Sequence, residues 1–514
     1  MAGWCTRLHL VRVVSIAAAT LHSVSAFAAS SVALAPAAMM RVGEIDARFQ
    51  SYNIEMVEVT GGYFWRPYRD GRKRPSSTAT PAGIDPSMFA YRSPIDLSNP
   101  RLRKLAAALG PAYLRVSGTW ANATYFDDAS NRAASPPKTF NGLLTREQWK
   151  GVVDFARTVD AKLVTSFATV AGARDASGAW TPTQADKLIA FTHTIGGTIA
   201  AAEFMNEPDL AAGSMPPGYD AASFARDIAA FRSFLTRASP QTILLGPGIV
   251  SGEGADGAMS ADKLLAASGS MFDAISYHHY GAPSQRCTKV AARGDAAFSD
   301  DWLSGAERAE TYHAGLRDKY APGRVLWITE TADASCGGNP WDVTFLDSFR
   351  YLDLLGRMAQ RGVQVVMHNT LAASDYGLLD EHDFTPRPNY WAALLWRRLM
   401  GATVLDPGVL PAPQLHLYAH CLRGRQGGVA LFAINKDRTR VLSLGLPARA
   451  SRYTLTAANL TDTRVRLNGR DLKLDARDDL PSLQGEPVAA GQLDLPPVSI
   501  TFLAVADAAN PACR

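Results

Sequence analysis

Two glutamates, each at the end of a short apolar run, are the side chains in this sequence best placed to do chemistry. Glu207 lies in EFMNEPD at 203–209, and Glu330 lies in VLWITET at 325–331. Each run resembles a buried strand, and the carboxyl ends of parallel strands are where barrel enzymes carry their catalytic side chains. Two carboxyl groups that face one substrate can cut a glycosidic bond. We therefore predict that this pair forms an acid–base site.

Neighbouring residues indicate how the pair is held. Pro208 disfavours helix at the residue before it, so we expect Glu207 to stay extended, although an isolated Asn-Glu-Pro could also be an exposed loop. Strand alternation puts Glu203 on the same face but deeper, where a structural ion pair is expected. Arg115 is a charge inside an apolar strand and needs a carboxylate partner. Glu330 is the natural candidate, because a nearby cation would keep a nucleophile ionised.

Other polar residues follow the predicted strands. His278 and His279 are adjacent on one strand and face opposite ways, so we expect structural histidines rather than a metal site. Tyr280, at the end of that strand, can donate a hydrogen bond to a carboxylate. Gly337 and Gly338 follow the second glutamate, and glycine lets backbone N–H groups approach an anion closely. A plain turn is the alternative there.

Eight strand-like runs alternate with helix-length amphipathic segments over residues 49–404. This alternation predicts an α/β fold with a parallel sheet, and eight units predict a (β/α)8 TIM barrel. The first run ends in Thr60-Gly61-Gly62, which lacks the phosphate-binding turn of a doubly wound sheet. The expected strands are Gln50–Val59, Ala112–Gly118, Lys162–Thr169, Ala201–Glu207, Thr242–Ile249, Phe272–Tyr280, Arg324–Thr331 and Val363–Thr370.

The pattern changes at residue 405, where helix-length segments give way to short alternating runs between turn residues. Such runs predict a C-terminal all-β sandwich domain over residues 405–514. They include 414–421, 429–434 and 498–505. The N-terminal segment 29–48 is a candidate for an additional strand of this domain.

Residues 1–28 have the features of a secretory signal peptide. Arg7 and Arg12 precede an apolar stretch, and Ala26-Phe27-Ala28 supplies small residues for cleavage. The stretch is shorter than the roughly 20 residues of a membrane anchor, so we expect a secreted or periplasmic protein. Removal of two arginines lowers the formal net charge from +4 to +2. We expect a monomer without a nucleic-acid or membrane partner.

Four cysteines remain after the predicted signal peptide: Cys287, Cys336, Cys421 and Cys513. Disulfides persist outside the reducing cytosol, and no Cys-x-x-Cys spacing indicates a zinc cluster, so two bridges are expected. Cys287 and Cys336 follow the sixth and seventh strands, which are neighbours on the catalytic face of a barrel. We therefore predict the pairs Cys287–Cys336 and Cys421–Cys513.

The chain resembles heparanase and its bacterial relatives, family 79 of the glycoside hydrolases. The shared blocks extend over nearly the whole mature chain: PAYLR at 111–115, NEP at 206–208, HHY at 278–280, WITET at 327–331, DYGLLDE at 375–381, NYW at 389–391 and LPPVS at 495–499. The resemblance implies that Glu207 is the acid/base and Glu330 the nucleophile. It assigns Gly337, Gly338 and Tyr376 to a uronic acid carboxylate. Our substrate-binding candidates further include Glu55, Arg115, Thr119, Asn206 and Tyr280.

Two features differ from the family pattern. The long excised linker of the animal enzyme has no counterpart between Tyr125 and Trp149, so we expect activity as a single chain. Ser335 and Cys336 stand where the family often has a tyrosine and a third glycine. The resemblance implies a secreted, retaining endo-β-glucuronidase that acts on heparan sulfate or a related acidic polysaccharide and needs no metal or cofactor. An exo-acting β-glucuronidase and a non-catalytic carbohydrate-binding protein are the alternatives.

Two predicted loops on the catalytic face are rich in cations. Binding of a sulfated polysaccharide would use such charges beyond the cleaved sugar, in salt-sensitive contacts. A pair of solvated loops without this role is the alternative. The loop after the first strand contains Arg66, Arg69, Arg72, Lys73 and Arg74 beside Tyr63, Trp65 and Tyr68, and the loop after the sixth contains Arg286, Lys289 and Arg293.

Overall fold

The computed structural model describes residues 32–69, 85–129, 135–288, 292–408 and 413–514. The expected signal peptide at 1–28 lies outside the described residues, as do Arg72, Lys73, Arg74 and Lys289. Within those ranges, no helix has the length and apolar character needed to cross a membrane.

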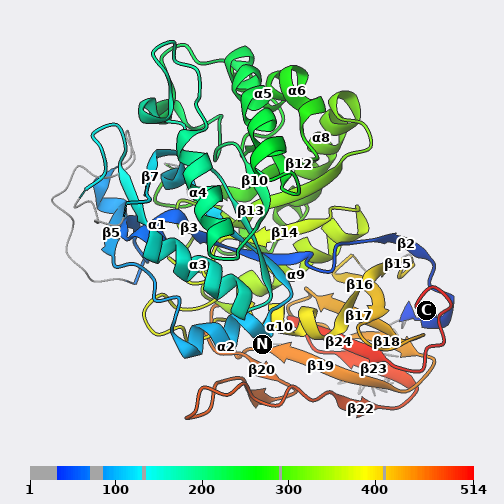
Figure 1. Ribbon diagram of the computed structural model, residues 1–514. Helices are drawn as coiled ribbons and strands as arrows, with labels where there is room; N and C mark the ends of the chain where they lie inside the picture. Colours follow the sequence, from blue (N-terminus) through cyan, green and yellow to red (C-terminus); the bar gives the residue numbers. More distant parts are fainter. Residues whose placement is uncertain (1–31, 70–84, 130–134, 289–291, 409–412) are drawn as a thin grey trace, which may run out of the picture.

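Eight parallel strands close into a barrel, each hydrogen-bonded to the next in chain order (Figure 1). The predicted (β/α)8 barrel is therefore confirmed, and each of the eight expected runs contributes a strand. The strands are β3 (Gln50–Glu55), β6 (Ala112–Ser117), β9 (Ala161–Thr165), β10 (Ile199–Glu203), β11 (Ile243–Ile249), β12 (Ala274–Pro283), β13 (Val325–Ser335) and β14 (Val365–His368).

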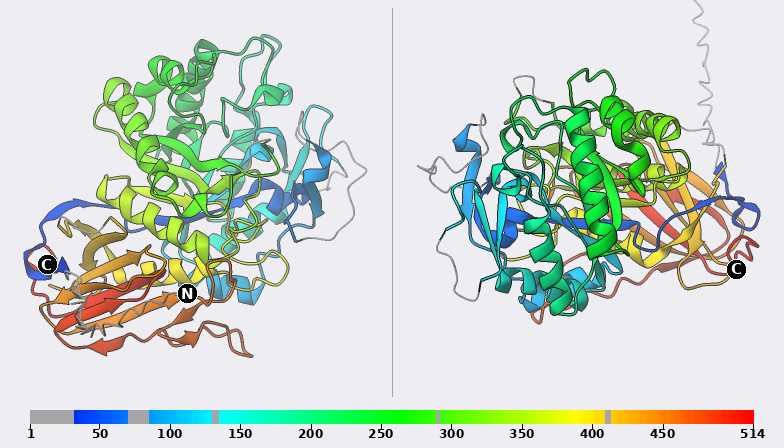
Figure 2. Two further views of the ribbon diagram at one scale, coloured as in Figure 1. Left: turned by 180° about the vertical axis from the view of Figure 1, so that it is seen from behind. Right: turned by 45° about the horizontal axis from the view of Figure 1, so that its top comes forward.

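Helices surround the barrel (Figure 2). Asn99 caps α2, because its side-chain oxygen accepts the N–H groups of Arg101 and Leu102. Pro100 occupies the first turn, where its missing N–H costs no hydrogen bond. The longer helices are α2 (Pro100–Ala108), α3 (Arg146–Thr158), α4 (Thr183–Thr194), α5 (Ala221–Ala238), α6 (Ala261–Ser268), α8 (Gly305–Tyr320), α9 (Phe345–Gln360) and α10 (Pro388–Leu399).

The first barrel strand is shorter than expected, because Met56–Thr60 forms the helix α1 instead of continuing it. Glu55 and Glu58 cap this helix reciprocally, since the side chain of each accepts the backbone N–H of the other. Two small sheets then extend the wall at the carboxyl ends of the barrel strands. They pair β4 (Gly62–Trp65) with β5 (Phe89–Arg92), and β7 (Thr124–Asp127) with β8 (Gly142–Thr145).

Side chains inside the barrel form layers, because successive residues of a strand point to opposite faces. One layer is apolar and consists of Tyr113, Val164, Ala201, Leu245, Ala274, Trp327, Val365 and Met367, packed with partly buried neighbours. Two residues further along four of these strands, the interior becomes polar. The buried residues there are Arg115, Glu203, Ser276 and Thr329. The apolar layer thus fills the barrel beneath the polar layer. The polar layer lies closer to the carboxyl ends of the strands, which we call the mouth of the barrel.

The all-β part begins at β15 (Met400–Leu405), slightly before the expected boundary, since this strand joins the large sheet directly after α10. That sheet has the order β2-β15-β16-β17-β24-β19-β20-β21, with β22 paired to β19, and a smaller sheet has the order β1-β18-β23. The strands are β1 (Val32–Ala33), β2 (Arg41–Glu44), β16 (Leu415–Leu422), β17 (Val429–Asn435), β18 (Leu442–Leu446), β19 (Ala450–Thr456), β20 (Arg466–Leu467), β21 (Arg470–Asp471), β22 (Glu486–Val488), β23 (Gly491–Leu495) and β24 (Ser499–Val505).

The large sheet is buried on both faces. Leu417 and Leu431 of this sheet share a core with Leu444 of the smaller sheet. Its other face packs on the barrel helix α10, where the rings of Trp396 and Phe432 lie 5.6 Å apart. The sandwich is therefore joined to the barrel by an apolar interface.

Two disulfides tie distant segments together. Cys421, at the end of the large sheet's strand β16, bonds Cys513 near the C terminus. Cys287 bonds Cys336, and so links the loops that follow β12 and β13. Both pairings are those expected from the sequence. One bridge therefore belongs to the sandwich, and the other lies at the barrel mouth.

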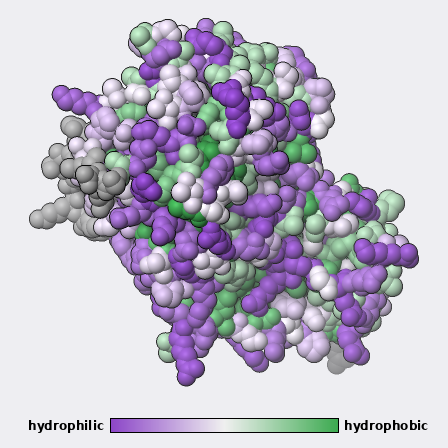
Figure 3. All heavy atoms as spheres, in the orientation of Figure 1, coloured by the Kyte–Doolittle hydropathy of each residue, from purple (hydrophilic) through white to green (hydrophobic). Residues whose placement is uncertain are grey.

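The surface is mainly polar. Hydrophilic side chains cover most of the face seen in Figure 3, and hydrophobic areas on it are scattered. The exposed large hydrophobic residues within the described ranges come from separate elements: Met40, Val42, Tyr68, Tyr91, Leu210, Val325 and Val441. The barrel mouth, with its buried charges, is therefore the best candidate for a functional site.

Candidate active site

Arg115 of β6 is the centre of the buried polar layer. Its guanidinium donates to Oε2 of Glu203 at 3.0 Å, to Oε2 of Glu330 at 2.9 Å and to Oδ1 of Asn206 at 2.7 Å. A buried arginine needs several acceptors, because its five donors and its charge have lost their water. The expected contact between Arg115 and Glu330 is present in the structure.

Glu203 of β10 forms the expected structural ion pair. Its Oε1 accepts the hydroxyl groups of Ser276 at 2.9 Å and Thr329 at 2.7 Å. Burial alone would raise the pKa of Glu203, but Arg115 and the hydrogen-bond donors outweigh burial and lower it. Glu203 therefore stays ionised and anchors Arg115 beneath the mouth.

Glu207 and Glu330 face each other across His278. The Nδ1 atom of His278 lies 2.9 Å from Oε1 of Glu207 and 3.7 Å from Oε2 of Glu330. One carboxylate oxygen of each glutamate lies within 4.8 Å of the other. The glutamate side chains are 13% and 8% exposed, so a substrate can reach them while most water is excluded. His278, predicted to be structural, is thus part of the site. It shares a strand face with Tyr280, which is the signal that could have revealed it.

Glu207 reaches this position through a backbone conformation that differs from the prediction. The strand β10 ends at Glu203, and Glu207 has a φ of 44°, in the left-handed region. The extended conformation predicted from Pro208 is therefore wrong. The cause is tertiary, because the N–H of Glu207 donates to the carbonyl of Gly248 on the neighbouring strand β11 at 3.1 Å. This bond holds the turn in a region that glutamate rarely occupies.

The surroundings raise the pKa of Glu207. Burial is the main cause; the hydrogen bond to His278 opposes it, and the negative charge of Glu330 adds to it. For His278, burial lowers the pKa, but the charge of Glu330 and the bond to Glu207 raise it by more. A raised pKa favours the protonated form that a general acid requires.

Tyr280 and Asn369 hold the second oxygen of Glu330. The Tyr280 hydroxyl donates to Oε1, and Nδ2 of Asn369 lies 3.4 Å from the same oxygen and 3.1 Å from the Tyr280 hydroxyl. With Arg115 on Oε2, both oxygens of Glu330 have donors, which fixes the carboxylate in one orientation. Asn369 was not predicted. Its position directly after β14 is the signal that could have revealed it.

Asn206 is oriented by a second residue that the sequence analysis missed. The side chain of Asn122 donates to the Asn206 carbonyl and accepts the Asn206 N–H, both at 2.8 Å. Asn122 belongs to the short 3-10 helix η3 (Thr119–Ala123). No local pattern reveals this role, because the two asparagines are 84 residues apart in the chain.

The loop after β13 carries the predicted glycine pair. Gly337 and Gly338 have φ values of 84° and 86°, and a Cβ on Gly337 would lie 2.4 Å from Cβ of Trp65. Backbone and packing therefore both require glycine. Among the described residues, the N–H of the buried Gly337 has no acceptor. Tyr376 is buried with Trp65 in an apolar cluster at the mouth.

Glu55 and Thr119, the remaining predicted substrate-binding residues, lie at different distances from the catalytic candidates. Glu55, at the end of β3, is buried, and burial followed by the charge of Glu330 raises its pKa well above the usual range. Its Oε2 is buried against Gly118 and has no hydrogen-bond partner in the described part of the chain. Thr119 is exposed, and no hydrogen bond among the described residues joins it to either catalytic candidate. The structure brings Glu55, but not Thr119, to the carboxylates.

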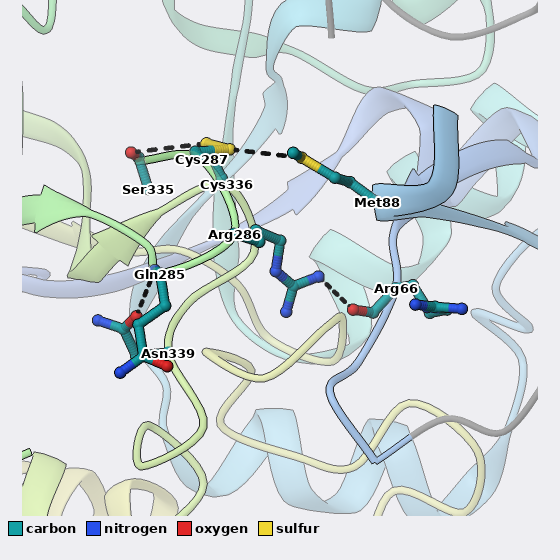
Figure 4. The surroundings of a disulfide bond; sticks show 8 residues. All are labelled: Arg66, Met88, Gln285, Arg286, Cys287, Ser335, Cys336 and Asn339. Atoms are coloured by element: carbon teal, nitrogen blue, oxygen red, sulfur yellow. Dashed lines mark hydrogen bonds between the residues drawn. A yellow bond between two sulfur atoms is a disulfide. The ribbon is translucent and has the colours of Figure 1, made fainter. Parts of the chain in front are cut away.

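Arg286 contacts other loops at the barrel mouth and is not a freely exposed cation. Its side chain is 10% exposed, pairs with Asp375 at 3.1 Å and lies 3.9 Å over the ring of Tyr68. It also donates to the carbonyl of Arg66 beside the Cys287–Cys336 disulfide (Figure 4). Arg286 is therefore paired within the protein instead of lying open at the surface, although its buried Nε has no hydrogen-bond partner among the described residues. A contact of Arg286 with a polyanion stays a prediction. Together its contacts within the protein tie three loops around the mouth.

Glu207, His278 and Glu330 are also close enough to hold one metal ion. Arg115 disfavours that use, because its guanidinium bonds Glu330 and lies 3.4 Å from Nε2 of His278. A bound cation would therefore lie beside a fixed positive charge. The donor set suits an acid–base pair better than a cation site.

Comparison with known proteins identifies the family of the chain. Residues 90–356, about half of the chain, match the model of glycosyl hydrolase family 79, N-terminal domain. The chain belongs to glycosyl hydrolase family 79. The matched region includes both Glu207 and Glu330. This family 79 protein is therefore a glycosidase, and the paired carboxyl groups at the mouth have the chemistry that such an enzyme requires.

Curated relatives and solved structures resemble the family 79 chain. It is 27% identical over 518 residues to heparanase of Mus musculus, with 86% of this chain and 93% of that one covered. It is 29% identical over 262 residues to baicalin-beta-D-glucuronidase of Scutellaria baicalensis, with 47% and 50% covered. A solved 4-O-alpha-L-rhamnosyl-beta-D-glucuronidase from Fusarium oxysporum has a TM-score of 0.62 at 15% identity, with 92% and 99% covered. The last likeness shows a shared fold.

Proposed function

We propose that this family 79 enzyme is a retaining β-glucuronidase with Glu330 as nucleophile and Glu207 as acid/base. The observation that carries the proposal is the separation of the two carboxyl groups, whose nearest oxygens lie within 4.8 Å. Retaining glycosidases hold these groups about 5–5.5 Å apart, whereas inverting ones need about 6.5–9.5 Å to admit a water molecule. The short separation favours direct attack on the sugar.

In the first step, Glu207 gives its proton to the glycosidic oxygen while the Glu330 carboxylate attacks the anomeric carbon. The leaving group departs as an alcohol, and a glycosyl ester forms on Glu330. Ester formation removes the negative charge of Glu330, which is one cause of the raised pKa of Glu207. The pKa of Glu207 then falls, so this residue can take a proton from the water that releases the sugar.

Proton NMR of the first product from an aryl β-glucuronide tests the stereochemistry. We expect β-glucuronic acid before mutarotation, and the α anomer would mean inversion. A 2-deoxy-2-fluoro glucuronide with a good leaving group should label the peptide that contains Glu330. A label on a different carboxylate would show that the roles are assigned wrongly.

We infer that the sugar at the cleavage point is a uronic acid. The free N–H of Gly337 and the neighbouring Tyr376 support this, together with the relatives that act on glucuronides. A hydrogen bond to a charged group contributes about 1.5–3 kcal/mol, so kcat/KM should favour an aryl β-glucuronide over the β-glucoside by about 10- to 100-fold. Equal values for the two substrates would contradict the assignment.

We further propose that the enzyme cuts within an acidic polysaccharide such as heparan sulfate. The similarity to mouse heparanase supports this, as do the cations Arg72, Lys73 and Arg74, which come between β4 and β5 in the sequence and lie outside the described residues. Replacing these three by alanine should weaken action on heparan sulfate and leave aryl glucuronide hydrolysis nearly unchanged, because surface cations act on a polyanion through charge. An equal loss on both substrates would indicate a folding defect instead.

An exo-acting β-glucuronidase is the second candidate, favoured by the similarity to baicalin-beta-D-glucuronidase. Product sizes distinguish the two. An endo-acting enzyme shortens heparan sulfate before free glucuronic acid accumulates, whereas an exo-acting one releases the monosaccharide from the start. No change on heparan sulfate in the triple alanine variant would also favour the exo-acting enzyme.

We also propose that the enzyme is exported and acts as a single chain. The features of residues 1–28 and the two disulfides support export, because disulfides persist in oxidising compartments. Sequencing of the secreted protein should find an N terminus close to Ala29, and full activity should accompany one uncleaved polypeptide. Activity that appears only after internal proteolysis would contradict the single-chain form.

A further inference from the structure

A groove next to the catalytic mouth lies between the barrel and the sandwich. Its volume is about 940 Å³, within the range of ligand pockets. The barrel side is formed by the loop that follows β14, with Trp391 of α10 and Val343. The sandwich side is formed by segment 463–475, which includes β20 and β21. None of the proposed catalytic steps uses this groove.

The sandwich side of the groove is held firmly against the barrel. Directly before segment 463–475 in the chain, the carbonyl of Asp462 accepts the N–H of Phe345 at 2.9 Å, and Phe345 begins α9. After the segment, Asp479 pairs with Lys104 of α2 at 2.8 Å. Because contacts fix the wall on both sides, the groove is present before any ligand binds.

The acidic side chains of the groove already have partners within the protein. Asp380 pairs with Arg387 at 3.3 Å, and Asp471 pairs with Arg466 at 2.8 Å. Three further acids accept backbone N–H groups: Glu381 from Ser374, Asp383 from Thr385 and Asp475 from Arg477 and Asp479. Their negative charge is therefore partly offset by the protein itself.

Exposed cations of the groove lack close partners. Arg69, Arg464 and Lys473 make no hydrogen bond or ion pair in the part of the chain that the structure describes. The charges of Arg464 and Lys473 act on the nearby Asp471 and, after its hydrogen bond with Arg466, help to lower its pKa. Leu472 and Leu474 flank Lys473 and line the same groove. A sugar ring offers C–H faces to apolar side chains and hydroxyl groups to carboxylates. An anionic sugar would in addition satisfy these cations.

We propose that this groove binds a stretch of the acidic polysaccharide away from the cleavage point, with Arg464 and Lys473 holding its carboxylate or sulfate groups. The inference rests on the proposed function, since a glucuronidase acting on polysaccharide must hold sugars beyond the one it cleaves. Asp375 connects the two places. Asp375 lines the groove, and its buried carboxylate accepts from Arg286 and from the N–H of Tyr68 at the mouth. A polysaccharide can therefore pass from one to the other over this shared wall.

Calorimetric titration with an octasaccharide from heparan sulfate tests the inference, in a Glu330→Gln background that prevents cleavage. The Arg464→Ala/Lys473→Ala variant should bind about five- to thirtyfold more weakly than its parent, as expected for the loss of two exposed charge contacts. In the otherwise unaltered enzyme, the same double variant should raise KM for heparan sulfate. Its kinetics on an aryl β-glucuronide should be unchanged, because that substrate does not reach the groove.

The matched control is Arg470→Ala/Arg477→Ala, which removes two exposed cations of the same region that do not line the groove. This control should retain the parent's affinity. Equal affinity of the Arg464/Lys473 variant and its parent would overturn the proposal, and so would an equal loss in the control. Failure of the proposed function would give a different result, because the unaltered enzyme would then not hydrolyse aryl glucuronides. The titration would still measure binding of the octasaccharide to the groove.

Discussion

Replacement of Arg115 by lysine keeps a positive charge inside the barrel but removes the fork of donors. Arg115 is almost fully buried and makes three hydrogen bonds of 2.7–3.0 Å, to Glu203, Glu330 and Asn206. A lysine ammonium is a compact charge and cannot reach three acceptors set around a planar group. We expect it to remain with Glu203, which lies deepest. Glu330 and Asn206 would then be without this donor.

The size of the effect follows from these hydrogen bonds. A hydrogen bond that involves a charged group contributes about 1.5–3 kcal/mol. Removal of two such bonds, with part of the energy recovered by water, should lower the free energy of unfolding by about 3 kcal/mol. The nucleophile is deprived of the donor on Oε2 and keeps Tyr280 on Oε1. Because one charged hydrogen bond to the reacting carboxylate is then missing, kcat should fall by about 10- to 100-fold.

Thermal unfolding and hydrolysis of an aryl β-glucuronide measure the two effects. Arg174→Lys is the matched control, because Arg174 is equally buried, pairs with Asp227 at 2.7 Å and makes no bond to the catalytic glutamates. The control should become less stable and keep its kcat. Wild-type kcat in Arg115→Lys, or an equal fall of kcat in the control, would refute this account of how Glu330 is held.

Three further predictions concern the mouth. The kcat should fall as pH rises through the raised pKa of Glu207, because a general acid works only while protonated, and Glu207→Gln should abolish this alkaline limb. Serine at both Cys287 and Cys336 should raise KM for glucuronides several-fold, because their bond holds the glycine loop; a loss confined to kcat would contradict this. Gly337→Ala should raise KM and lower the melting temperature, since its φ of 84° and the 2.4 Å approach to Trp65 both exclude a side chain; unchanged kinetics and melting would refute it.

What the sequence by itself determined is the framework of the protein. The alternation of apolar strands with amphipathic helices predicted the barrel. The spacing of apolar residues in a segment reflects which face of that element is buried, and it can be read from neighbouring residues alone. The same logic pointed to a buried Arg115 that requires a carboxylate, and to glutamates at two strand ends. Loops that follow neighbouring strands lie together in any barrel, which is why the pair Cys287–Cys336 could be expected.

The tertiary structure alone decided how the mouth is assembled. Glu207 turns into the left-handed region because Gly248, on another strand, accepts its N–H, and this hydrogen bond overrides the local preference set by Pro208. The contact of His278 with Glu207 and the ion pair of Arg286 with Asp375 likewise depend on residues far away in the chain. Such contacts arise only when separate strand ends come together in the folded chain. The residues next to a carboxylate or a cation in the sequence do not indicate which distant side chain will be its partner.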